Sequence, residues 1–154
     1  MREIKFRYVW KRKEDGHIYM EISSVELLGQ KESGRFKGNE LWKLIGRDQH
    51  TGLRDKNGND IYEGDIIQGY VSDEDDDGEV IERRLVRRVV KWLDGAPKGD
   101  PGKKDNPSTF NQNPQFVGDP IDGYEDGSMY WSEFHECEII GNIHEDKDLL
   151  VKAG

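Results

Sequence analysis

The sequence predicts a mainly β protein with minor α content, folded as a barrel-like or sandwich-like domain of short antiparallel strands and long loops. Apolar and polar residues alternate along several segments, and Gly- or Asn-containing turn signals separate those segments. An aromatic content of 10%, with four Trp, argues against a disordered chain. At this length we expect residues 1–154 to form a single domain.

The first two strands are predicted as a hairpin. Residues 3–10 alternate with the period of two that is typical of a half-buried strand. The apolar face consists of Ile4, Phe6, Tyr8 and Trp10, and the charged face of Lys5 and Arg7. A turn at 14–16 leads into a return strand over 17–22, a loop over 29–40 and a further strand over 41–46.

The segment 51–67 contains the clearest turn signals. Asn57-Gly58 predicts a two-residue type I′ hairpin turn, because both residues accept a positive φ. Glu63-Gly64-Asp65 predicts a bend into a strand over 66–71, in which Gly69 marks a kink or bulge.

The second half of the chain is less regular. Residues 79–93 have apolar side chains at helical spacing, but their Val-rich run favours a strand, with 73–78 as the tip of a long hairpin. All five Pro fall in 97–120, so 95–128 is expected to be a Pro/Gly-rich excursion, either functional or disordered. A last strand over 138–143 and a short turn or helix to residue 150 complete the prediction.

The charge distribution bears on partners. Residues 1–54 carry 12 Lys/Arg and 8 Asp/Glu, whereas residues 55–154 carry 11 and 24. A net charge of -9 disfavours nonspecific binding to nucleic acid. A local basic surface remains an alternative, formed by Arg83, Arg84, Arg87 and Arg88 together with Lys5 and Arg7. The plainer interpretation makes these arginines partners of the neighbouring acids.

The acidic stretch partly matches a calcium loop. Carboxylates at Asp73, Asp75 and Asp77 occupy positions one, three and five of an EF-hand loop, and Gly78 occupies position six. Position twelve should be a Glu and is Arg84, and the flanking residues favour strands. A weak divalent-metal site, and with it a metal-assisted hydrolase, is therefore only an alternative.

No other catalytic arrangement is evident in the sequence. Cys137 and His135 share a strand face, but a small buried hydrophobe is the favoured role for Cys137. The four His are scattered without the spacing of a zinc site. We therefore expect no catalytic centre and no cofactor.

Composition also bears on location. One Cys fits a reducing cytoplasm, and no apolar run approaches the roughly 20 residues that a membrane-spanning helix needs. The first residues lack the apolar core of a secretion signal. We expect a cytoplasmic protein that does not contact the membrane.

Three blocks of sequence resemble the YopX family of phage and prophage proteins. They are the opening Arg2-Glu3-Ile4-Lys5-Phe6-Arg7-Tyr8-Val9-Trp10, the segment from Thr51 to Ile67, and the ending Glu138-Ile139-Ile140-Gly141-Asn142-Ile143-His144-Glu145. The resemblance implies a mainly β, barrel-like fold, a bacterial host and no established activity. It assigns no catalytic residue, so the signature is expected to be structural. Its residues are Thr51, Gly52, Leu53, Asp55, Asn57, Gly58, Ile61, Tyr62, Gly64, Asp65, Ile140, Gly141 and Asn142.

The leading functional hypothesis is a phage accessory protein that acts as a non-catalytic protein-binding or self-assembling module. Its partner is an unknown protein or a second copy in a homo-oligomer. Nucleic-acid binding and metal-assisted hydrolysis are the two alternatives.

Overall fold

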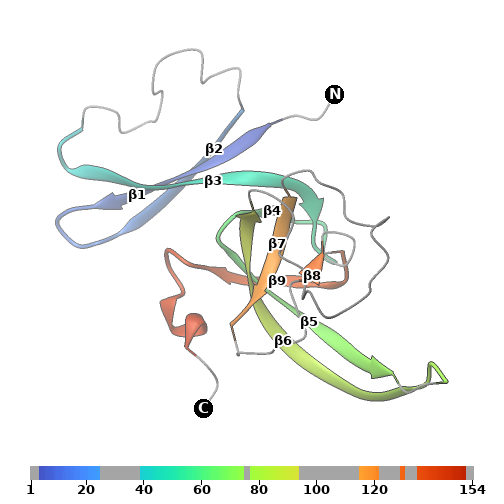
Figure 1. The fold of residues 1–154 in the computed structure, drawn as a ribbon. Helices are drawn as coiled ribbons and strands as arrows, with labels where there is room; N and C mark the ends of the chain where they lie inside the picture. Colours follow the sequence, from blue (N-terminus) through green and yellow to red (C-terminus); the bar gives the residue numbers. More distant parts are fainter. Residues whose placement is uncertain are drawn as a thin grey trace.

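The computed structural model describes residues 4–24, 39–74, 77–93, 115–121, 129–130 and 135–151. These residues form two antiparallel sheets and short 3-10 segments, with no α-helix in the described ranges (Figure 1). The mainly β prediction is confirmed. A closed barrel is absent from the described part of the chain, because the strands belong to two separate sheets.

The first sheet has the strand order β2-β1-β3-β4. Its strands are β1 (Lys5–Arg12), β2 (Ile18–Ser24), β3 (Trp42–Arg54) and β4 (Asp60–Tyr62). The β1–β2 hairpin is confirmed, with Lys5 opposite Ser24 and Lys11 opposite Ile18. The strand predicted over 41–46 is the beginning of the longer β3, which also pairs with β1.

The second sheet has the strand order β8-β7-β6-β5-β9. Its strands are β5 (Asp65–Glu74), β6 (Val80–Leu93), β7 (Gln115–Pro120), β8 (Met129–Tyr130) and β9 (Glu138–Asn142). The strand over 79–93 and its long hairpin with β5 are confirmed. Within the excursion expected over 95–128, residues 115–120 form β7, which pairs with β6. The rest of that excursion lies outside the described residues, except Ile121.

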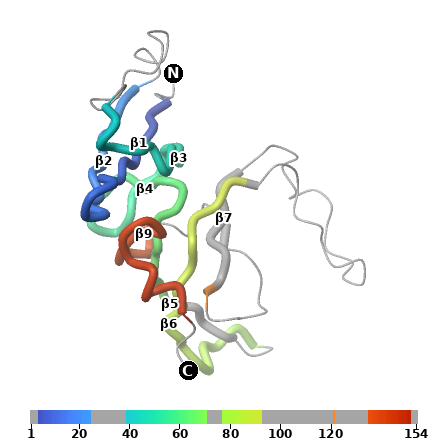
Figure 2. The backbone as a smooth tube through the Cα atoms, turned by 90° about the vertical axis from the view of Figure 1, so that its left-hand side faces the viewer, coloured from blue at the N-terminus to red at the C-terminus, as the bar shows by residue number. Residues whose placement is uncertain are grey.

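A tight turn at Gly64 carries the chain from the first sheet into the second. Gly64 has a φ of +80°, a conformation that favours glycine. Its N–H donates to the Val90 carbonyl at 2.8 Å, and its own carbonyl accepts the N–H of Ile143 at 2.9 Å. The predicted bend is therefore confirmed, and its two hydrogen bonds join it to β6 and to the C-terminal turn. Figure 2 shows β1 to β4 in the upper part of the molecule, with β9, β5 and β6 below them.

The apolar core lies in and beside the second sheet. Its fully buried members are Ile61, Ile67, Val90 and Cys137, with Leu53, Trp92 and Ile139 packed against them. Cys137 is thus a buried core residue, as predicted, whereas His135 is exposed. The C-terminal element is the 3-10 helix η3 (Lys147–Leu150).

Two local predictions need correction. The charged face expected for β1 is not a solvent face, because Arg7 and Val9 are both buried. The Asp55 N–H donates to the Asn59 carbonyl at 2.9 Å, so the turn enclosed by this pair between β3 and β4 has three residues, 56–58, instead of two. In such a loop the positive φ falls on the last position, here Gly58 at +84°.

No helix in the described ranges is long and apolar enough to span a bilayer.

Candidate functional site

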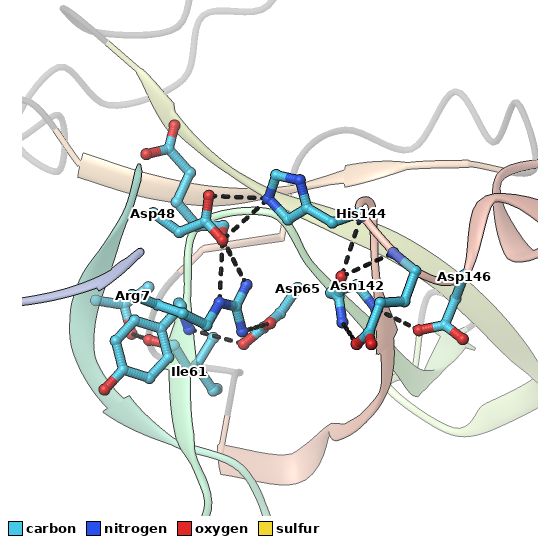
Figure 3. Close-up of polar contacts among 11 residues, drawn as sticks. Arg7, Asp48, Ile61, Asp65, Asn142, His144 and Asp146 are labelled. Atoms are coloured by element: carbon cyan, nitrogen blue, oxygen red, sulfur yellow. Dashed lines mark hydrogen bonds and ion pairs between the residues drawn. The ribbon is translucent and has the colours of Figure 1, made fainter. Parts of the chain in front are cut away.

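A buried ionic cluster joins the two sheets. β1 places Arg7 directly opposite Asp48 of β3. The Arg7 Nε and Nη2 atoms donate to Asp48 Oδ2 at 3.0 and 2.8 Å, while Nη1 donates to Asp65 Oδ1 at 2.5 Å. One guanidinium therefore bridges two carboxylates, one from each sheet (Figure 3).

Asp65 is the most deeply buried charge of this cluster, with 1% of its surface exposed. It is the first residue of β5, and its Oδ2 accepts the Tyr62 N–H at 2.8 Å. Burial raises the pKa of the Asp65 carboxyl, and the charge of Arg7 offsets that rise only in part. Burial also opposes the charge on Arg7, but Asp65 and Asp48 together raise the Arg7 pKa.

His144 adds a third chain segment to the cluster. Its Nε2 lies 3.1 Å from each Asp48 oxygen. Gly46 makes room for the ring, since a Cβ at that position would lie 2.5 Å from His144 Cε1. The imidazole therefore reaches Asp48 only because residue 46 has no side chain.

The turn after β9 holds His144 in position. Asn142 Oδ1 accepts the N–H groups of His144 and Glu145 at 3.0 and 3.1 Å. The Asn142 N–H in turn donates to Asp146 Oδ2 at 3.0 Å. A Cβ on Gly141 would lie 2.5 Å from that Asp146 oxygen, so the turn requires glycine there.

A second set of hydrogen bonds extends from Asp55. Its carboxylate accepts the N–H groups of Asn57 and Asn59 at 2.9 Å each, and that of Ile139 at 3.1 Å. Burial works against the charge, but these hydrogen bonds outweigh it and lower the Asp55 pKa. Asp55 thus ties the β3–β4 loop to β9.

The Thr51 hydroxyl links β3 to β4 in the same region. Its hydroxyl donates to the Ile61 carbonyl at 2.8 Å and accepts the Leu53 N–H at 3.1 Å. Together with Gly64, Asp65 and Asn142, these residues place much of the signature at the junction of the sheets.

The chemistry available to the cluster is limited by its internal partners. Arg7 already makes four hydrogen bonds, to Asp48, to Asp65 and to the Glu63 carbonyl at 3.2 Å. Within the described ranges, no group of three or more His, Cys, Asp or Glu is arranged to hold a metal ion. The arrangement therefore fastens chain segments together.

Two of the three residues proposed for a metal site lie on the described part of the β5–β6 hairpin. Asp73 lies in β5 opposite Glu82, and Asp77 is exposed in the turn that follows. Asp75 lies outside the described residues.

The four arginines of β6 do not form one basic surface. Strand alternation places Arg84 and Arg88 on one face and Arg83 and Arg87 on the other. Arg88 is buried, and Arg87 donates to the carbonyls of Leu149 and Val151 at 3.1 Å each. Arg7, included in the same alternative, is buried at the junction. The residues of the nucleic-acid alternative are therefore divided between the two faces of β6 and the buried junction.

Sequence reasoning missed the roles of Asp48 and His144, and it assigned Arg7 to the solvent face. One signal was available: Arg7 lies between aromatic and aliphatic residues in a strand that buries them. Its partners could not be read from the sequence, because Asp48 and Asp65 are 41 and 58 residues away.

The fold and the site define a small β protein whose two sheets are joined by buried polar contacts between its first strand, its middle segment and its C-terminal turn. Residues 5–151 match the sequence model of a protein family described as "YopX protein". The chain therefore belongs to the YopX family. A comparison with curated proteins finds no match.

Proposed function

We propose that the chain is a phage or prophage accessory protein that acts in the bacterial cytoplasm as a non-catalytic module, binding a protein or a second copy of itself. The proposal rests on a difference between the buried polar residues and the exposed apolar residues of the molecule. The polar signature residues are engaged with one another, whereas large apolar side chains are exposed elsewhere.

The observation that carries the proposal is the exposed apolar surface on the β5–β6 hairpin. Tyr70 and Leu85 are 61% and 50% exposed and lie directly opposite each other. Contiguous exposed apolar groups mark interaction sites more often than single ones do. We define this pair, with Ile81 nearby at 67% exposure, as the hairpin patch.

The experiment is an affinity capture of the tagged protein from induced host lysate, with and without nuclease. We expect a stoichiometric protein that survives nuclease treatment and is lost in the Tyr70→Ser, Leu85→Ser variant. Ile22→Ser is the matched control, because Ile22 is 59% exposed but lies on β2 of the other sheet. Recovery that requires nucleic acid, or that persists in the patch variant, contradicts the proposal.

A further inference from the structure

The β5–β6 hairpin continues beyond its sheet as a two-stranded arm. β9 pairs with β5 only over Asp65–Gln68, and β7 pairs with β6 only from Arg88 onward. Residues 69–74 and 80–87, here called the arm, therefore pair only with each other among the described strands. Figure 1 shows this arm extending away from both sheets. A two-stranded ribbon is at best marginally stable alone in water, so contact with another surface would stabilise it.

The arm combines apolar groups with negative charge. The hairpin patch lies on it, and the segment 73–84 contains seven Asp/Glu and two Arg. Glu82 on the arm is exposed, and so are Asp77 and Glu79 in the turn that joins its two strands. Arg83 is directed to the Tyr70 ring, 5.1 Å from its centroid, so this cation belongs to the patch itself. The matching surface must therefore be apolar and positively charged.

The outer end of the first sheet has those properties. Leu41 and Leu44 are 63% and 42% exposed, and Ile45 is exposed beside them. Lys11 and Lys43 lie directly opposite each other in the β1–β3 ladder. We call these five residues the lysine end.

The two lysines make the lysine end electrostatically unfavourable in an isolated chain. Like charges opposite each other on adjacent strands are destabilising. Neither lysine forms an ion pair or a hydrogen bond with another described side chain. Segments 11–17 and 40–47 together contain five Lys/Arg and three Asp/Glu, so the local balance is positive. An acidic partner would relieve the repulsion between the lysines.

We infer that the arm of one copy binds the lysine end of a second copy. The inference rests on the proposed function and names the partner. Figure 1 places the arm and the lysine end at opposite ends of the molecule, so one chain cannot join them. Each copy carries both surfaces, and a two-fold exchange of arms uses both in a closed dimer.

The first test is the mass of the purified protein in solution, by sedimentation over about 1–100 μM. We expect a species heavier than the 17.8 kDa chain that dissociates on dilution and with added salt. The Tyr70→Ser, Leu85→Ser variant should weaken association by about tenfold or more, and Ile22→Ser should not. A monomer at every concentration, or equal loss in the control, overturns the inference.

The second test uses charge reversal in two separate variants. Asp77→Lys with Glu79→Lys and Glu82→Lys leaves four Asp/Glu against five Lys/Arg in segment 73–84 and makes the arm basic. Lys11→Glu with Lys43→Glu leaves three Lys/Arg against five Asp/Glu in segments 11–17 and 40–47 and makes the lysine end acidic. Each variant alone should be monomeric, because like charges then face each other. Mixing the two should restore association, since each basic surface then meets an acidic one. Failure of the mixture, while circular dichroism shows both variants folded, overturns the inference.

The two proposals fail in distinguishable ways. If the purified chain is monomeric but lysate capture still depends on the hairpin patch, the partner is a different protein and only the second-copy inference falls. If neither experiment depends on the patch, both proposals fall.

Discussion

Gly69 and Cys137 are in such close contact that a Cβ on residue 69 would lie 2.6 Å from the Cys137 sulfur. The glycine in β5 therefore serves close packing. The register shifts of β5 lie elsewhere, at Ile66/Ile67 and Asp73/Glu74.

Because of this contact, we expect the stability effects of substitutions at Gly69 and Cys137 to be coupled. Gly69→Ala should lower the free energy of unfolding by about 1–3 kcal/mol, because the methyl group overlaps the sulfur. Cys137→Ala removes the sulfur and leaves a cavity, so it should also destabilise. The double variant should lose clearly less free energy of unfolding than the two single variants lose in sum, as measured by urea denaturation. Additive losses would show that the two residues do not compete for the same space.

Removing the positive charge of Arg7 should strongly destabilise the protein. Arg7→Met leaves Asp48 and Asp65 buried without their partner, and we expect a loss of about 3–5 kcal/mol in stability. Arg7→Lys keeps the charge but cannot bridge both carboxylates, so its loss should be intermediate. Arg47→Met is the control, because Arg47 is exposed. A loss from Arg7→Met no greater than that of the control contradicts this role for the cluster.

Asp55 predicts a pH dependence with a definite sign. Its folded-state pKa lies below the ordinary 3.8, so the ionised carboxylate favours the folded state above that pH. This contribution is lost as the pH falls below 3.8 through the lowered pKa. Asp55→Asn should therefore destabilise at neutral pH, by about 2–3 kcal/mol, and the difference from wild type should shrink on acidification. A constant difference from pH 7 to pH 2 would contradict this account.

Gly46 predicts an effect transmitted through His144. Gly46→Ala should displace the imidazole from Asp48, because the new methyl group would lie 2.5 Å from Cε1. We expect a change in the His144 ring signals by NMR and a stability loss of about 1–3 kcal/mol. Gly58→Ala is the comparison: no atom lies within 4 Å of its added Cβ, but its φ is positive. That variant should destabilise without moving the His144 signals.

Local features of this fold were predictable, and distant pairings were not. The β1–β2 hairpin follows from alternation over adjacent residues, and the bend at Gly64 follows from the three residues that form it. Alternation also divides β1 correctly into two faces, but it does not say what lies against each face. Arg7 is buried where Asp65 of β5 and the ring of Tyr62 lie against it, and no local pattern encodes those contacts.

The same limit explains the candidate site. Asp48 and His144 are 96 residues apart, and neither stands in a motif that suggests a charge partner. The signature residues were identified as turns and strand starts. Their convergence at one junction depends on the order of strands in both sheets.

The ionic junction also has a consequence for synthesis on the ribosome. At about 5–20 residues per second, His144 is added roughly 5–20 s after Asp48, a separation of 96 residues. In the nascent chain, Arg7 can pair with Asp48 and then with Asp65 early. His144, the last member of the cluster, is added only with the C-terminal turn. The first sheet is therefore made well before the junction that fastens it to the second is complete.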